Sequence, residues 1–207
     1  MRNLFSIAIL ACLLLHPALL QADMEVVAKY QPCIACHGEA AQGNVELGAP
    51  ALAGQGVAYL ERQLKHFKSG ARGSDPRDTK GAQMKGMVAT LSDEDISRIA
   101  NYVSGHPRPN PAAPAGDLKN GNNYYQSKCG ACHGGKAEGN PGLNAPALAG
   151  LDAAYLKHQY RNFQQGLRGT HPDDTYGRQM KMMSTSLPTD NDLDDVIAFI
   201  LSLDKPG

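Results

Sequence analysis

The sequence Cys33-Ile34-Ala35-Cys36-His37 recurs with one change as Cys129-Gly130-Ala131-Cys132-His133. Two cysteines three positions apart, followed at once by histidine, are typical of c-type haem attachment. In this chemistry the two thiols add to the vinyl groups of the porphyrin, and the histidine binds the iron. The sequence therefore predicts two covalently attached haem c groups, one at each motif.

The two motifs lie at the same place in an internal duplication. Shifted by 96 residues, 33–91 aligns with 129–187 without a gap and is identical at 32 of 59 positions. This shift exceeds the roughly 20 to 50 residues of solenoid repeats and fits two tandem copies of a small domain. We therefore expect domains at 23–106 and 115–207, joined by a Pro-rich, extended linker at 107–114.

Three other interpretations of the cysteines fit less well. A redox dithiol usually comes with a strand and helix framework, of which we find no sign. A single zinc site normally takes cysteine pairs about 12 to 20 residues apart. Here the pairs are 96 residues apart. Two disulfides would leave His37 and His133 unexplained, so the repeated motif favours haem.

Each copy is expected to be helical, and we find no convincing strand. Ser92 and Thr189 are each followed three positions later by an aspartate, which predicts a capping box before an apolar final helix. Gly, Pro and Asn are frequent elsewhere, so we expect long irregular stretches between the helices. The expected helices are 23–32, 58–69 and one starting at Ser92 in the first copy, and 117–128, 155–163 and one starting at Thr189 in the second.

The repeat also supplies candidates for the sixth iron ligand. Met84 and Met87 align with Met180 and Met183, and both pairs lie in polar surroundings where core filling, the usual role of a methionine, is less suited. A thioether opposite histidine raises the reduction potential and closes the iron to small molecules, which points to electron transfer. Repetition alone does not choose between the two methionines of each pair.

Four other histidines could bind iron in principle. None of them has a histidine 96 residues away, so we interpret them as surface or loop residues. They are His66, His106, His158 and His171.

With these motifs in place, the chain resembles the two-domain, two-haem bacterial cytochromes c, most closely the cytochrome c4 family. The similarity covers nearly all of 23–207 and includes Pro-Ala-Leu-Ala-Gly-Gln at 50–55 and Leu-Ser-Asp-Glu-Asp-Ile at 91–96. In the family, the axial methionine lies seven residues before the leucine that precedes the last helix. Counted from Leu91 and Leu187, the resemblance implies Met84 and Met180 as iron ligands opposite His37 and His133, with Met87 and Met183 as secondary candidates.

The resemblance further implies an all-α fold of two cytochrome c domains related by pseudo-twofold symmetry. It implies an electron carrier rather than an enzyme, taking electrons from a donor such as a quinol–cytochrome c reductase and passing them to a terminal oxidase or another acceptor. An alternative is the cytochrome subunit of a flavin- or quinone-dependent dehydrogenase. A di-haem enzyme, such as a peroxidase or thiosulfate dehydrogenase, is less favoured because it needs an open iron site.

Two further repeated pairs have expected roles near the haem. Pro50 and Pro146 would place a backbone carbonyl beside the axial imidazole, and the alternative is a plain turn. Arg72 and Arg168 would pair with haem propionates, and the alternative is a solvated loop charge.

Composition narrows the function further. The 20 Lys plus Arg residues balance 20 Asp plus Glu residues, which argues against a nucleic-acid partner. Aromatic residues make up 6% of the chain and tryptophan is absent, so the protein-only core looks thin, and two porphyrins would fill it.

Residues 1–22 have the pattern of a secretory signal: a positive start, a short apolar run and a small residue at the end. Pro17 interrupts a run that is already shorter than the ~20 apolar residues of a spanning helix. We expect cleavage after Ala22 and a periplasmic protein, with peripheral membrane association left open. Lipid attachment at Cys12 is a minor alternative. Cleavage removes Cys12, and two haems consume the other four cysteines.

Overall fold

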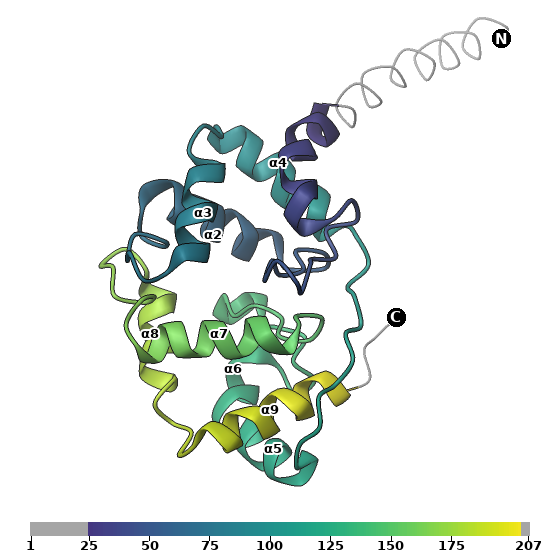
Figure 1. Cartoon of the computed structure of the whole chain (residues 1–207), viewed down its shortest axis with the longest axis vertical. Coiled ribbons are helices and arrows are strands. Elements are labelled where there is room, and N and C mark those ends of the chain that lie inside the picture. Colours follow the sequence, from purple (N-terminus) through teal and green to yellow (C-terminus); the bar gives the residue numbers. More distant parts are fainter. Residues whose placement is uncertain (1–24, 204–207) are drawn as a thin grey trace, which may run out of the picture.

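The computed structural model describes residues 25–203, so the expected signal sequence and its cleavage site lie outside the described residues. Between residues 25 and 203, the only β pairing is two isolated bridges, Asn44 with Ala49 and Asn140 with Ala145. The all-α prediction is confirmed. Figure 1 shows two helical bodies, one above the other, connected along one side by an extended segment.

The described part of the first repeat has four helices. Residues 25–37 are helical and end with the first cysteine motif. They are followed by α2 (Val57–Ser69), α3 (Thr79–Val88) and α4 (Asp93–Ser104), with α2 packed on both α3 and α4. Between them lies a core of small and aliphatic side chains with one tyrosine: Tyr30, Ala41, Ala53, Leu60, Ile99, Ala100 and Val103.

The second repeat follows the same plan. The expected 117–128 helix is divided into α5 (Leu118–Tyr124) and a π-helical turn (Tyr125–Cys129), which lead into the short α6 (Gly130–His133). Then come a 3₁₀ turn (Pro141–Leu143), α7 (Ala153–Gln164), α8 (Thr175–Met183) and α9 (Asp190–Ser202). Helix α9 packs on α5 and α7. Gly121 lets α5 approach α9 closely, since a Cβ there would strike the backbone of Asp195.

The helix signals in the sequence are confirmed at both final helices. Ser92 with Asp95 caps α4, and Thr189 with Asp192 caps α9, each as a complete capping box. Helix α2 ends at Gly70, which has a φ of 83° and so adopts the left-handed conformation that glycine tolerates best.

Helices α3 and α8 correct the sequence analysis, which placed irregular chain there. Each begins after a buried aspartate whose side chain accepts a hydrogen bond from the backbone N–H three residues on, at 2.9 Å in both cases: Asp78 from Gly81, and Asp174 from Gly177. Glycines and polar side chains interrupt the apolar periodicity of these helices, so the periodicity did not predict them. The aspartate caps stabilise the helix starts instead.

The two repeats meet through a ring of four polar side chains, three of them buried and the fourth, Gln159, half-buried. The Arg72 guanidinium donates to the side-chain oxygens of Gln63 (2.8 Å) and Gln159 (2.9 Å). Arg168 donates to the same two oxygens, at 2.9 Å to Gln159 and 2.7 Å to Gln63. Since Gln63 and Arg72 align with Gln159 and Arg168 in the duplication, the ring has the pseudo-twofold symmetry of the repeat. We call these four residues the Gln–Arg ring.

The linker is held against both repeats by one side chain. Arg108 Nη2 donates a 2.6 Å hydrogen bond to the backbone oxygen of Gly54, and its aliphatic part lies against Gly54 and Gly150. These glycines are equivalent in the duplication and have φ values of 67° and 91°. A Cβ at either position would strike Arg108.

Candidate functional site

The histidines of both motifs are buried and oriented in the same way. His37 and His133 are each 5% exposed, and Nδ1 of each lies 2.9 Å from a proline carbonyl oxygen, that of Pro50 or Pro146. A carbonyl oxygen only accepts hydrogen bonds, so Nδ1 carries the proton in both rings. Nε2 is therefore the free lone pair, as a metal-binding imidazole requires.

Burial also keeps these rings neutral. It lowers the pKa of both His37 and His133, and this outweighs the opposing effect of the hydrogen bond to the proline carbonyl. Burial likewise raises the pKa of the Cys129 thiol to about 11, with a smaller contribution from Cys132. The site thus presents uncharged donors to an apolar space.

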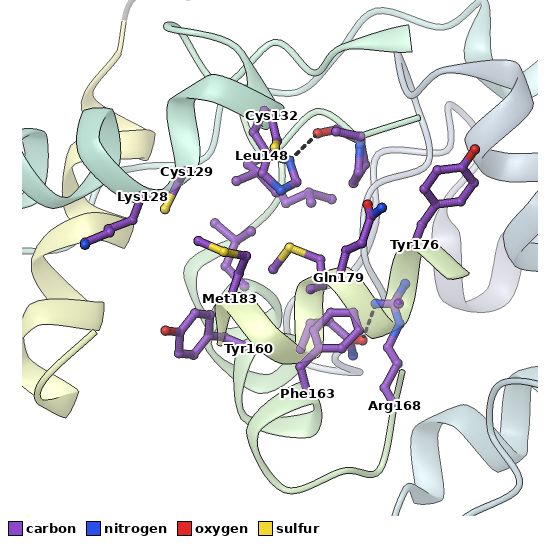
Figure 2. Close-up of a pocket in the computed structure, with 18 of the residues that line it drawn as sticks. Lys128, Cys129, Cys132, Leu148, Tyr160, Phe163, Arg168, Tyr176, Gln179 and Met183 are labelled. Atoms are coloured by element: carbon purple, nitrogen blue, oxygen red, sulfur yellow. Dashed lines mark hydrogen bonds between the residues drawn. The ribbon is translucent and has the colours of Figure 1, made fainter. Parts of the chain in front are cut away.

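A cavity of about 640 Å³ opens beside the second motif. Figure 2 shows Cys129 and Cys132 on one side of it, facing Met183, Tyr160 and Phe163 on the other. The rest of the lining is mainly apolar and comes from loops and from α7, α8 and α9. It includes Pro146, Leu148, Leu151, Leu156, Met180, Leu187, Leu193, Val196, Ile197 and Ile200.

The methionine pairs lie on α3 and α8, the two helices that the sequence analysis missed. Met180 and Met183 are one helical turn apart and both line the cavity. Within each pair the first residue is the more buried: Met84 and Met180 are half-buried, whereas Met87 and Met183 are 49% and 39% exposed.

Arg72 and Arg168 are each 7% exposed, so the solvated loop charge considered for them is wrong. Their terminal nitrogens bind the glutamines of the Gln–Arg ring, and each guanidinium lies over a phenylalanine, Phe67 or Phe163. The Nε of each is buried without a hydrogen-bond partner. An unpaired, buried cationic donor beside an apolar cavity suits an anionic group at the edge of a bound cofactor.

These features fit a haem c group. The cavity is apolar, two cysteines and an oriented imidazole line it with a methionine thioether, and Arg168 lines it as well. Between residues 25 and 203, no group of three His, Cys, Asp or Glu side chains is placed so that it could hold a metal ion directly.

The other histidines are placed elsewhere. His66, interpreted from sequence as a surface or loop residue, lies on α2 with a side chain only 13% exposed, and its Nδ1 is 3.5 Å from a carboxylate oxygen of Asp174. It is buried because α2 packs at the interface between the repeats. His106 contacts Tyr102 edge to face, and His158 is exposed.

Gln63 and Gln159 were not predicted from the sequence as site residues, although both line the cavity beside the second motif. Each is a polar residue on the apolar face of a helix, identical in the two copies. A polar residue on an apolar helix face, repeated in both copies, was the sequence signal that could have identified them.

The cytochrome c family matches two regions of the chain, residues 25–107 and 118–204. A thiosulfate dehydrogenase electron acceptor from Thiomonas intermedia (strain K12) is 37% identical over 155 residues, which is 68% of this chain and 66% of that protein. Cytochrome c4 from Stutzerimonas stutzeri is 36% identical over 158 residues, 71% of this chain and 74% of that protein.

Among solved structures, reduced recombinant cytochrome c4 from Pseudomonas stutzeri superposes with a TM-score of 0.72 at 28% identity. The match covers 87% of this chain and 98% of that one. The expected arrangement of two helical domains, each with a haem-attachment motif, is thereby confirmed.

Proposed function

The chain belongs to the cytochrome c family, and we propose that it carries single electrons between redox proteins of the periplasm. Each of its two covalent haem c groups would supply an iron suited to one-electron transfer. The observation that carries the proposal is the duplicated donor set. Each copy presents a buried, neutral imidazole fixed by a proline carbonyl, and a half-buried methionine on the helix before the last.

We assign the ligands as the motif suggests. Cys33, Cys36, Cys129 and Cys132 would hold the two porphyrins, and the iron ligands would be His37 with Met84 and His133 with Met180. Burial supports this choice of methionines, because Met87 and Met183 are the more exposed members of their pairs. A thioether in the sixth position leaves no room for an exchangeable ligand, which suits a carrier better than an enzyme.

The arginines of the Gln–Arg ring are assigned to the propionates. Arg72 and Arg168 each keep one buried, unpaired Nε, while their other nitrogens are fixed by the glutamines. A carboxylate there would satisfy that nitrogen and neutralise a buried charge.

The proposal also includes the export of the protein, its domain boundaries and its redox partners. We propose a signal peptide at 1–22, domains at 23–106 and 115–207 and a linker at 107–114, with a quinol-oxidising donor and a terminal oxidase as acceptor. No helix between residues 25 and 203 combines the length and apolar character needed to cross a membrane.

A second candidate function is supported by two relatives that share one name. The similarity to a protein named thiosulfate dehydrogenase electron acceptor favours a dehydrogenase as the electron donor. Mixing the oxidised protein with thiosulfate dehydrogenase and thiosulfate would distinguish the two possible electron donors. Haem reduction within the enzyme's turnover time favours the dehydrogenase, and slow reduction favours a different donor.

The carrier function is tested by carbon monoxide. The purified, reduced two-haem protein should show no change in its haem spectrum on exposure to the gas, and its oxidised form should be low-spin at both haems. A carbon monoxide complex or a high-spin ferric signal at either haem contradicts the closed site and favours an enzyme.

A further inference from the structure

One side of the domain interface carries a contact that the repeat symmetry does not reproduce. Arg62, on α2 of the first domain, donates hydrogen bonds to the backbone oxygen (2.8 Å) and the side-chain oxygen (3.2 Å) of Asn144 in the second domain. Its guanidinium lies over the ring of Tyr176, 4.6 Å from the centroid. The amide of Asn144 in turn donates to the Tyr176 hydroxyl at 2.8 Å. We call this set of three residues the Arg62 contact.

The equivalent positions on the other side cannot form such a contact. A shift of 96 residues places His158 opposite Arg62, Gly48 opposite Asn144 and Lys80 opposite Tyr176. His158 is exposed and lies 3.3 Å from the amide of Asn162 in its own helix. Gly48 has no side chain to accept a hydrogen bond, and Lys80 would repel a cation. All three members of the contact are therefore missing together.

The Arg62 contact closes the second haem cavity from the side of the first domain. Arg62 lines the cavity together with His133 and Met180, although it belongs to the other domain. Its Nε is buried and has no hydrogen-bond partner. A guanidinium stays charged at neutral pH, so a positive charge is held at the wall of this cavity.

The other charges near the cavity do not reproduce this asymmetry. Asp174 and Arg168 line it, but each has a buried counterpart in the first domain, Asp78 and Arg72, so a charge of the same sign is present in both domains. Lys128 also lines the cavity without a charged counterpart, but it is exposed and therefore screened by water and salt.

We propose that Arg62 is a residue of the second haem site, supplied by the first domain, and that it raises the reduction potential of the second haem without affecting the first. The reason is electrostatic. Reduction removes one positive charge from the iron, and a nearby, poorly hydrated cation favours the form with the smaller charge. The inference rests on the haem assignment proposed above, but not on the location or the redox partner of the chain.

The experiment uses the full two-haem chain and three variants. Arg62→Gln removes the charge and keeps an amide donor, Arg62→Lys keeps the charge, and His158→Gln is the matched control at the mirrored position. A redox titration with haem-resolved NMR signals, assigned with methionine variants, measures the two potentials. Arg62→Gln should lower the potential of the second haem alone. Arg62→Lys should keep that potential close to the wild-type value, and His158→Gln should shift the potential of neither haem.

Three results would overturn the proposal: an unchanged second haem in Arg62→Gln, equal shifts of both haems, or a shift in Arg62→Lys as large as in Arg62→Gln. A shift of the first haem in His158→Gln comparable to that of the second in Arg62→Gln would also contradict it. Failure of the carrier function would appear separately, as carbon monoxide binding to the reduced wild-type protein.

Discussion

The side chain of Gln55 forms two hydrogen bonds with the backbone of Ala147 across the domain interface. Its amide donates to the Ala147 carbonyl at 2.7 Å, and its oxygen accepts from the Ala147 N–H at 3.2 Å. Ala147 directly follows Pro146, whose carbonyl orients His133. The first domain thus steadies the segment that fixes the second imidazole, whereas Leu151, the counterpart of Gln55, has no amide to return the contact.

We predict that Gln55→Leu destabilises the protein. Gln55 and Ala147 are 4% and 3% exposed, so the change leaves two buried backbone groups unpaired, at roughly 1–3 kcal/mol each. Denaturant unfolding of the two-haem protein measures the loss. Gln164→Leu, at an exposed position on α7, is the control and should leave stability nearly unchanged. Equal stabilities of the two variants would contradict the prediction.

The proposed axial methionines are tested within each pair. Met180→Ala should abolish the Fe–S absorption band of the second haem and allow carbon monoxide to bind there. Its potential should fall by a few tenths of a volt, since axial-ligand identity sets haem potentials over about 0.8 V. Met183→Ala, one helical turn away, should keep the band. Loss of the band in Met183→Ala instead would reassign the ligand, and Met84 and Met87 are compared in the same way.

Removing the linker contact should expose the linker. Arg108→Ala deletes the hydrogen bond to Gly54, and a bond from a charged donor contributes about 1.5–3 kcal/mol. Since each 1.4 kcal/mol is a factor of ten, cleavage by elastase within the alanine-containing linker should accelerate roughly 10- to 100-fold. The control is Arg77→Ala, because Arg77 is an exposed residue bound to Asp75 in its own loop. Equal cleavage rates in both variants would rule out this role of Arg108.

The capping box of α4 predicts a pH dependence. Hydrogen bonds from Ser92, with Lys29 nearby, lower the pKa of Asp95 to about 2. Because the pKa is lower in the folded state, the ionised carboxylate stabilises the fold above its ordinary pKa, and this is lost as the pH falls towards 2. Asp95→Asn should therefore lower the melting temperature at neutral pH and weaken its fall in acid. Glu46→Gln, on an exposed loop, should do neither.

Much of the fold followed from local signals. Ser92 and Thr189 predicted the starts of the last helices, because a capping box is a property of four consecutive residues. Helices α3 and α8 were missed since their apolar faces are interrupted by residues such as Gly81 and Gly177. An aspartate followed by threonine at 78–79 and 174–175 was the overlooked start signal.

The candidate site shows the same difference between residues that local signals predict and residues that they do not. The motif and the repeat were enough to indicate His37 and His133, whose partners lie 13 residues further along the chain. The burial of Arg72 and Arg168 was not predictable, because it depends on how the two domains meet. A comparison of the copies position by position, at residues where they differ, would have drawn attention to Arg62.

The Gln–Arg ring uses one donor and one acceptor from each domain, and both domains contribute the same kind of residue. Such a surface is self-complementary: it is the isologous contact found in symmetric homodimers. A single copy of this domain therefore carries both residue types that the ring needs, a glutamine acceptor and an arginine donor. The linker joins the two copies and adds the contact of Arg108 with Gly54 and Gly150. It replaces a concentration-dependent encounter with an effective concentration in the millimolar range, so the two haems stay paired however dilute the protein becomes.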